Sequence, residues 1–252
     1  MADSGFSLDG QRVLVTGASV GIGAAIASRL ANAGATVVVV SRSGEVPQSN
    51  GAMHSLVADL SEPEETDTVI ERAVDLLGGL DVLVNNVGRA DPMPFADVDR
   101  DYFNAYVELN LWAPLRLCQH AYEHLAQSND PSVVMIGSVD AERPSPGSVV
   151  YGATKGALSA ATVALSKEWM AAGIRVNQVN PGLVDTQLAS EIVHSLKESG
   201  ESINIAGRVG LPDEIAGLVH YLVAPVGRFA NGASFRIDGG ALALGPFDRW
   251  QQ

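Results

Sequence analysis

The sequence has very little cysteine, because Cys118 is the only one in 252 residues. A single thiol rules out an intrachain disulfide, and it also rules out a metal site built from several thiolates. Cys118 lies in an apolar run, residues 115–118, so we expect a buried and unreactive side chain. We therefore expect neither a disulfide framework nor a metal site.

Long apolar runs are missing as well. No stretch approaches the ~18 consecutive apolar residues that a membrane-spanning helix needs. The first eleven residues contain two acids and no apolar segment, which is not the pattern of a signal peptide. We therefore expect a cytoplasmic protein that does not act at a membrane.

Basic residues are scarce relative to acidic ones, with 16 Lys and Arg against 29 Asp and Glu and a formal net charge of −13. Such a chain repels nucleic acid phosphates and anionic membrane surfaces, so we expect neither as a partner. An anionic ligand must therefore be held by local hydrogen-bond donors. A hydrophobic content of 46% is ample for a core, and no linker or repeat divides the chain, so residues 1–252 are expected to form one domain.

Three glycines follow the first apolar run of the chain. The apolar residues 13–15 lead into Gly17, Gly21 and Gly23, a helix-period segment covers residues 24–33, and residues 36–40 form a second Val-rich run. Strand, glycine turn, helix and parallel strand make one βαβ unit. In that context Gly17 permits the tight turn. Gly21 and Gly23 keep side chains away from a pyrophosphate at the helix N-terminus, as in dinucleotide-binding proteins.

The rest of the chain continues this alternation. Strands are expected at residues 54–58, 81–84, 132–136, 174–179 and 234–237, and helices at 61–77, 99–127, 148–170 and 212–222. Ser61 is expected to cap the helix that follows it, and residues 45–53 to form a loop. The pattern predicts an α/β fold with a doubly wound parallel sheet of about seven strands, a Rossmann fold. A polar helical segment with its flanks, residues 187–207, is expected to form a flexible substrate flap.

Tyr151 and Lys155 lie four residues apart in the expected helix 148–170. Side chains at this spacing share a helix face, and a nearby ammonium group favours the ionised phenol and lowers its pKa. Such a phenol can exchange a proton with an alcohol or carbonyl oxygen. The pair also occurs by chance on solvated helices, so its meaning depends on the surrounding site. Ligands bind doubly wound sheets at the strand C-terminal ends, where Asn86 and Ser138 are expected.

Two amides and one guanidinium group leave alternatives open. Asn85 is either a structural amide or a ligand contact, and Asn110 is either a satisfied core amide or a functional one. Ser41 ends the second strand, where an NAD site usually carries an acid for the ribose 2′-hydroxyl, and Arg42 follows it. A guanidinium group suits a 2′-phosphate, so NADP(H) is favoured over NAD(H). The alternative is that Arg42 is a solvated loop charge.

With these motifs in place, the chain resembles the short-chain dehydrogenase/reductase family over nearly its whole length, residues 12–240. Two features depart from the family pattern: Val20 stands where NADP-preferring members often carry a basic residue, and Val87 replaces an alanine. The motifs that carry the resemblance are Thr16-Gly17-x-x-x-Gly21-Ile22-Gly23, Asn85-Asn86-Val87-Gly88, Asn110, Ser138, Tyr151-x-x-x-Lys155 and Asn180-Pro181-Gly182.

The resemblance implies a catalytic group of Asn110, Ser138, Tyr151 and Lys155. Tyr151 would act as general acid in reduction and as base in oxidation, and Lys155 would lower its pKa and bind the nicotinamide ribose. Ser138 would hydrogen-bond the substrate oxygen, and Asn110 would hold a water in a proton relay. The implied cofactor-binding residues are Gly17, Ser19, Val20, Gly21, Ile22, Ser41, Arg42, Asp59, Leu60, Asn86, Gly88, Tyr151, Lys155, Pro181, Gly182, Val184 and Thr186.

The resulting hypothesis is an oxidoreductase that transfers hydride reversibly between NADP(H) and a carbonyl or secondary alcohol, acting as a ketone reductase on an uncharged, moderately apolar substrate. The alternatives are an NAD-dependent alcohol dehydrogenase of the same family and a non-catalytic cofactor-binding sensor or scaffold. The resemblance also implies a homo-oligomer, a tetramer or dimer, and the small-residue face at residues 157–164 permits close helix contact. Two aromatics in the tail, residues 245–250, cover a neighbouring site or pack on their own subunit.

Overall fold

The Val-rich runs form a seven-stranded sheet in the computed structural model, which describes residues 5–199 and 203–243. Every neighbouring pair of strands is parallel, and the order is β3-β2-β1-β4-β5-β6-β7. The order reverses between β1 and β4, so the sheet is doubly wound, as the sequence predicted. The strands are β1 (Arg12–Thr16), β2 (Thr36–Ser41), β3 (Met53–Val57), β4 (Val82–Asn85), β5 (Ser132–Ile136), β6 (Arg175–Pro181) and β7 (Ser234–Ile237).

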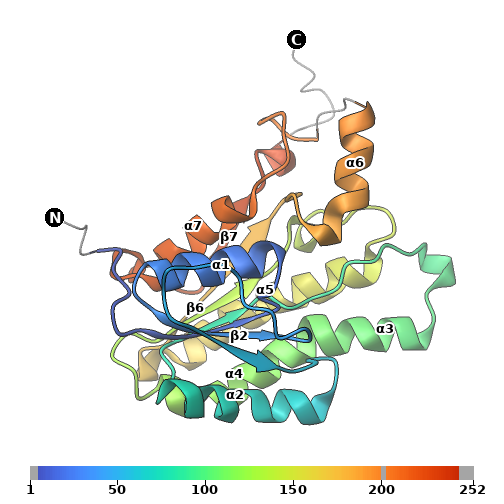
Figure 1. Ribbon diagram of the computed structural model, residues 1–252. Helices are drawn as coiled ribbons and strands as arrows, with labels where there is room; N and C mark the ends of the chain where they lie inside the picture. The colour runs from blue at the N-terminus through green and yellow to red at the C-terminus, as the bar shows by residue number, and fades with distance from the viewer. Residues whose placement is uncertain (1–4, 200–202, 244–252) are drawn as a thin grey trace.

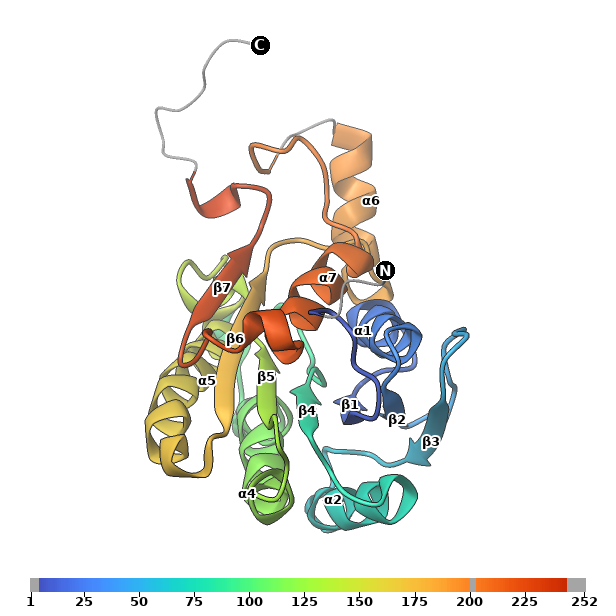
Figure 2. The same cartoon turned by 90° about the vertical axis from the view of Figure 1, so that its left-hand side faces the viewer.

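Helices cover both faces of the sheet (Figures 1 and 2). The first face packs against α1 (Gly21–Asn32) and α7 (Pro212–Val223), and the second against α2 (Pro63–Leu77), α4 (Ala113–Leu125) and α5 (Val149–Glu168). Two further helices are α3 (Arg100–Val107), which leads into α4, and α6 (Ser190–Ser199), which projects from the body of the domain in Figure 1. Short turns are η1 (Phe95–Asp97), η2 (Glu108–Trp112), η3 (Val139–Ala141), η4 (Met170–Ala172), η5 (Gln187–Ala189), η6 (Pro225–Gly227) and η7 (Ala241–Ala243).

Two apolar clusters hold these layers together, because alternate strand residues point to opposite faces of the sheet. Val13 and Val37 belong to the cluster under α1 and α7, while Leu14 and Val38 belong to the cluster under α2, α4 and α5. Cys118 lies in the second cluster, and its burial raises the pKa of its thiol to about 12. The expectation of a buried, unreactive thiol is therefore confirmed.

The long helix expected over residues 99–127 is interrupted by η2, a π turn. There the N–H of Ala113 bonds to the carbonyl of Glu108, five residues earlier. The cause is Pro114, which has no N–H to donate and whose ring clashes with the carbonyl four residues before it, that of Asn110. The chain widens by one residue instead of breaking, a feature that is frequent at functional sites. Asn110 lies inside this turn and is buried.

The predicted capping role of Ser61 is wrong. Glu62 occupies the position before α2, without a side-chain cap bond, and Pro63 is the first helical residue. The Ser61 hydroxyl donates to the Asp59 carboxylate at 2.7 Å instead. Ser61 does not cap because α2 begins at Pro63, which places Ser61 one residue before the capping position.

Three further expectations concern the loop after β2, membrane-spanning helices and the chain segments that the structure does not describe. Residues 45–52 form no helix or strand, as predicted, so the second βαβ unit is shortened. Within residues 5–199 and 203–243, no helix combines the length and the apolar character needed to cross a membrane. The tail at residues 245–250, the first four residues and part of the expected flap, residues 200–202, lie outside the described residues.

Candidate active site

The glycine turn joins β1 to α1 at the C-terminal edge of the sheet. Gly17 has φ = 61° and Gly21 has φ = 60°, a left-handed backbone that glycine adopts without strain. α1 begins at Gly21, three residues earlier than expected, and the preceding Val20 makes no side-chain cap bond. The first N–H groups of α1 therefore have no partner within the helix and lie at its positive end. This cradle fits an anionic pyrophosphate.

Gly23 was predicted to keep side chains away from a pyrophosphate, and the structure shows that it is needed for close packing. A Cβ atom at this position would overlap the carbonyl oxygen of Gly17 and the side-chain nitrogen of Asn86. Gly23 is therefore required for packing α1 on the turn, not for access of a ligand. Asn86 holds the same turn, because its Nδ2 donates to the carbonyls of Thr16 at 3.0 Å and Gly17 at 2.9 Å.

The residues after β6 return to the glycine turn. A Cβ atom on Gly21 would lie 3.3 Å from the Thr186 methyl carbon, so Thr186 lies against the turn. Val184 is buried and forms an isolated parallel bridge with Gly210. A side chain on Gly182 would overlap Asp238, which follows β7. The expected cofactor residues on both sides of the sheet edge are thus brought together here.

The end of β2 carries an uncharged, buried residue followed by an exposed guanidinium group. The Ser41 hydroxyl accepts a hydrogen bond from the Gly44 N–H at 3.1 Å, which closes the loop on which Arg42 is exposed. Burial of Asp59 acts to raise the pKa of its carboxyl, but hydrogen bonds from Ser61 and the charge of Arg42 hold that pKa below its usual value. Leu60, one of the residues expected to bind the cofactor, is buried in the core below α2.

Ser138 and Tyr151 meet at the end of β5. Ser138 is buried, and its hydroxyl accepts the Asp140 N–H at 3.1 Å. Burial raises the pKa of the Tyr151 phenol, a hydrogen bond with Ser138 acts to lower it, and the Asp140 carboxylate acts to raise it again. The net effect is a raised pKa, so the phenol is protonated at neutral pH. This sign is opposite to the lowering expected from Lys155, because desolvation opposes ionisation.

Lys155 lies one helical turn after Tyr151 and is buried. Its Nζ donates to the Ile136 carbonyl at 2.9 Å and lies 5.8 Å from the centre of the Tyr151 ring. Burial lowers the pKa of Lys155 to about 8. A Cβ atom on Gly88 would lie 3.6 Å from Nζ and 3.3 Å from the Asn110 Oδ1, so Gly88, Asn110 and Lys155 converge on one point.

The oxygen and the nitrogen of the Asn110 side-chain amide each hydrogen-bond to the backbone of Arg89. Its Oδ1 accepts the Arg89 N–H at 2.9 Å, and its Nδ2 donates to the Arg89 carbonyl at 2.9 Å. The backbone carbonyl of Asn110, to which Pro114 cannot donate, is available to hold a water. Asn85 is structural, because its Nδ2 donates to the Pro114 carbonyl at 3.3 Å beneath α4.

The structure adds residues that sequence reasoning missed. The hydroxyls of Tyr102 and Tyr106 both donate to the Asp91 carbonyl at 2.6 Å, and the Arg89 guanidinium lies 4.9 Å from the Tyr106 ring centre. The four-residue spacing of the two tyrosines was the available signal. Together these contacts fix the loop after β4. Asp140, half-buried beside Tyr151, gave no signal beyond following Ser138 by two positions.

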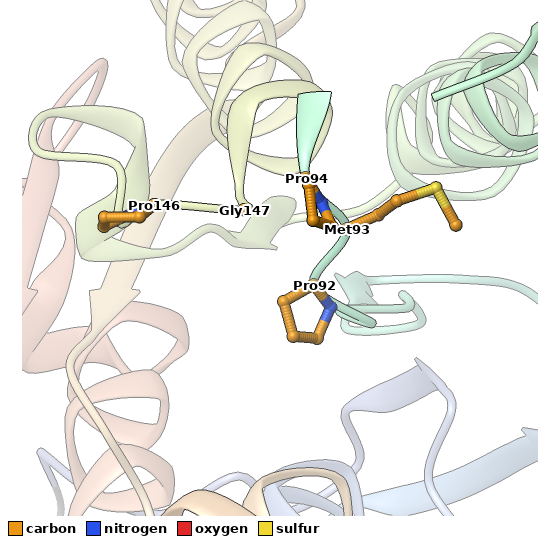
Figure 3. A pocket seen from close by; sticks show the side chains of 5 residues that line it. All are labelled: Pro92, Met93, Pro94, Pro146 and Gly147. Atoms are coloured by element: carbon orange, nitrogen blue, oxygen red, sulfur yellow. The ribbon is translucent and has the colours of Figure 1, made fainter. Parts of the chain in front are cut away.

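A pocket of about 430 Å³ opens between this loop and the segment before α5. Figure 3 shows three prolines and a methionine side chain around it, with Gly147 between the two segments. The segments are joined by a bond from the Met93 N–H to the Gly147 carbonyl at 3.0 Å. The pocket is lined by Pro92, Met93, Pro94, Pro146 and Gly147. No group of three metal-ligating His, Cys, Asp or Glu side chains occurs in the part of the chain described.

Comparison with known proteins places this arrangement in a family. A family model described as enoyl-(acyl carrier protein) reductase matches residues 17–241. An uncharacterized oxidoreductase of Methylorubrum extorquens is 36% identical over 245 residues, covering 92% of this chain and 98% of that protein. A tropinone reductase homolog of Arabidopsis thaliana is 34% identical, covering 96% of each chain.

The fold is also similar to that of a solved structure from the same family. A short chain dehydrogenase from Burkholderia cenocepacia in complex with NADP has a TM-score of 0.82 and 34% sequence identity, covering 93% of this chain and 99% of that one. The chain is therefore an oxidoreductase of the short-chain dehydrogenase/reductase family.

Proposed function

We propose that this oxidoreductase is an NADP(H)-dependent ketone reductase that interconverts a carbonyl compound and a secondary alcohol. The observation that carries the proposal is the convergence of Ser138, Tyr151, Lys155 and Asn110 beside the glycine turn of α1. A proton donor, a second hydroxyl and a buried ammonium group thus share one edge of the sheet with a cradle for pyrophosphate.

The cofactor would be held by the free N–H groups of α1, by Thr186 above Gly21, and by Arg42 at a 2′-phosphate. When bound, it supplies the hydride. The printed description of the Burkholderia structure, a complex with NADP, supports this choice. The position of Asp59 near Arg42 favours the alternative, an NAD-dependent alcohol dehydrogenase, because that carboxylate competes for the guanidinium group.

The protein contributes the proton and the position of the reacting oxygen. The raised pKa keeps the Tyr151 phenol protonated, so it can donate to a developing alkoxide without prior ionisation. The Ser138 hydroxyl is the second donor directed at the same oxygen. Lys155 supplies positive charge behind the phenol, and the Asn110 backbone carbonyl is placed to hold a water next to Lys155.

The substrate proposed is uncharged and moderately apolar. The pocket between Pro92 and Pro146 is lined by apolar groups and adjoins the first turn of α5, which carries Tyr151. The name of the Arabidopsis relative, a tropinone reductase homolog, supports reductase chemistry of this kind. Residues 187–207 remain the proposed flap, with Leu188, Ile192 and Ile205 exposed on it.

Assembly is proposed as a homo-oligomer, a tetramer or dimer, through α4 and α5. Ala157, Ala160, Val163 and Ala164 are exposed on α5 in the single chain, and Trp112 is exposed at the end of η2, directly before α4. Small side chains permit close helix approach, and burying these apolar groups stabilises association. A cytoplasmic location remains a prediction.

The first test compares wild type with Tyr151→Phe, which removes one oxygen atom. NADPH oxidation is measured against a panel of ketones, sugars and acyl thioesters. We expect turnover to fall by at least about 100-fold, the lower range for loss of a general acid. Tyr122→Phe is the control, because that phenol belongs to α4 and packs beside Trp169. Equal turnover of wild type and Tyr151→Phe would remove the proposed role of Tyr151.

A further inference from the structure

β6 carries side-chain amides at positions where the sheet is otherwise apolar. All seven of its residues are buried, yet they include Asn177, Gln178 and Asn180. A buried amide without partners is costly, because it loses its hydrogen bonds to water. The hydrogen-bond partners of these amides therefore show which parts of the structure the amides connect.

Gln178 faces α5 and is fully buried. Its Nε2 donates to the Ser159 hydroxyl at 2.8 Å and to the Asn180 Oδ1 at 2.7 Å, and its Oε1 lies 3.2 Å from the Thr162 hydroxyl. Both amide protons are thus used, while the single proton of the Thr162 hydroxyl is shared between Gln178 Oε1 and the Leu158 carbonyl at 2.9 Å. Satisfied buried networks of this kind specify one arrangement of the elements they join.

The network reaches the backbone of Lys155. The Ser159 hydroxyl, which accepts from Gln178, itself donates to the Lys155 carbonyl at 3.2 Å. The Lys155 ammonium is held at its other end by the Ile136 carbonyl of β5 at 2.9 Å. Lys155 is therefore fixed by both neighbouring strands, directly by β5 and through Gln178 by β6.

The same amide reaches the Asn180-Pro181-Gly182 motif, in which Pro181 and Gly182 are expected to bind the cofactor. Asn180 precedes Pro181 and Gly182, and the Gly182 N–H bonds to the Ile237 carbonyl at 3.0 Å. Gln178 thus connects the α5 turn that carries Lys155 with the Asn180–Gly182 segment.

Gly137 provides the space for this connection. A Cβ atom there would overlap both the Asn180 Oδ1 and the Gln178 Nε2. Gly137 also donates its N–H to the Val179 carbonyl at 2.8 Å, and it directly precedes Ser138. The amide pair therefore lies directly behind the backbone that presents Ser138, so two of the four proposed catalytic residues, Ser138 and Lys155, are anchored near it.

We infer that Gln178 is a positioning residue that fixes the Tyr151–Lys155 turn of α5 relative to the Asn180–Gly182 segment, and so aligns the proton donor with the hydride donor. The inference rests on the proposed function for its catalytic consequence, but the mechanical connection is a property of the chain alone. Gln178 touches no reacting group, and it acts through Ser159 and Asn180.

Two variants and two matched controls test it. Gln178→Met keeps the length of the side chain and removes its hydrogen bonds, while Asn177→Leu alters an equally buried amide on the opposite face of β6, where Asn177 bonds to the Ala230 carbonyl at 2.9 Å. Ser159→Ala removes the bonds of this hydroxyl to Gln178 and to the Lys155 carbonyl, and it leaves the bond between Gln178 and Asn180 in place. Its control is Ser166→Ala, because the Ser166 hydroxyl bonds within α5 to Val163 at 2.8 Å.

The first readout is hydrogen–deuterium exchange of the cofactor-free protein. Gln178→Met is expected to accelerate exchange in peptides covering residues 151–162 and 180–186, and Ser159→Ala in the first of these. The controls should leave both segments at the wild-type rate. Equal protection of these segments in Gln178→Met and wild type overturns the inference, whatever the protein catalyses.

The second readout is the deuterium isotope effect on turnover with NADPH labelled at the transferred position. Misplacement by about 1 Å can cost about 100-fold in rate, and a partial loss of alignment in Gln178→Met is expected to lower turnover about 10-fold. The isotope effect should rise as hydride transfer becomes rate-limiting, while NADPH affinity, set mainly at the glycine turn, changes little. An unchanged isotope effect together with an inactive Tyr151→Phe overturns the inference and leaves the proposed function standing. An active Tyr151→Phe refutes the proposed function instead.

Discussion

Lys155 destabilises the fold that it serves. Its ammonium is buried between α5 and β5, where one backbone carbonyl is its recorded hydrogen-bond partner. Water would offer the ammonium more partners and a higher dielectric constant, so burial favours the neutral amine. Replacing Lys155 by methionine, which has a similar length and no charge, should therefore stabilise the cofactor-free protein at neutral pH.

The magnitude follows from the pKa of this group. Burial lowers the pKa of Lys155 from 10.5 to about 8. Each pKa unit corresponds to about 1.4 kcal/mol, so the charged form costs the folded state about 3 kcal/mol at pH 7. Between pH 8 and 10.5 the unfolded chain binds more protons than the folded chain, so stability rises with pH across this window. The destabilisation is complete below pH 8 and has almost vanished at pH 10.5.

The assay is urea unfolding of the cofactor-free protein at pH 7, 9 and 10, comparing wild type with Lys155→Met. The variant should be more stable by about 3 kcal/mol at pH 7, about 2 kcal/mol at pH 9 and less than about 1 kcal/mol at pH 10. Lys167→Met is the control, because Lys167 is exposed on the last turn of the same helix and its charge is solvated. Taking the difference between variants removes the contribution of other groups that titrate at high pH.

A variant that is less stable than wild type at pH 7 would refute this reasoning, since it would mean that the bond to Ile136 outweighs desolvation. A stabilisation that does not change between pH 7 and pH 10 would also refute it, because the effect would then come from packing. The gain in stability should be accompanied by a joint loss of turnover and NADPH affinity, as expected if Lys155 serves both Tyr151 and the cofactor.

Two further predictions concern the cofactor cradle. Arg42→Ala should weaken NADPH binding about 10-fold, the equivalent of one charge-assisted hydrogen bond, and leave NADH binding unchanged. Fluorescence titration measures both affinities, and equal NADPH affinity in wild type and variant would make Arg42 a solvated loop charge. Gly23→Ala should lower the free energy of unfolding by about 1–3 kcal/mol, because the added methyl group meets the rigid Gly17 carbonyl. In thermal melts Gly217→Ala is its control, since a methyl group on that α7 glycine would first meet atoms of the Arg29 side chain at 3.8 Å, an ordinary contact distance.

The fold was readable from the sequence because local and global signals agree in this chain. Val-rich runs such as 36–40 form fully buried strands, and glycines end the connecting helices, so the alternation predicts a parallel sheet. The π turn was not predicted from the sequence, although Pro114, which has no N–H to donate, indicated an interruption of the helix. The helical pattern continues on both sides of Pro114 over residues 99–127, and this gave the stronger signal although proline is disfavoured inside a helix.

The sequence predicted the site residues from their types and spacings, but it did not predict their contacts. Which atoms they use depends on contacts between segments distant in sequence. The Asn110 amide is hydrogen-bonded to the backbone of Arg89, 21 positions away. A side chain at Gly23 would clash with the carbonyl of Gly17. The sign of the Tyr151 pKa shift was mispredicted because spacing reveals a nearby charge but not the degree of burial. Gln178 gave no signal at all, since two of its three partners, Ser159 and Thr162, lie on α5.

Burial moves the two groups of the Tyr151–Lys155 pair in opposite directions, raising the pKa of the phenol and lowering that of the ammonium. Both shifts favour the neutral form, so this site is prepared for proton donation at neutral pH. In the proposed reaction, reduction uses the phenol as it stands. Oxidation needs the phenolate, and the pH increase that would form it also removes the charge of Lys155 above about pH 8. At neutral pH the pair therefore consists of a protonated phenol beside a charged ammonium, which is the state that can donate a proton to a carbonyl oxygen in the proposed reaction.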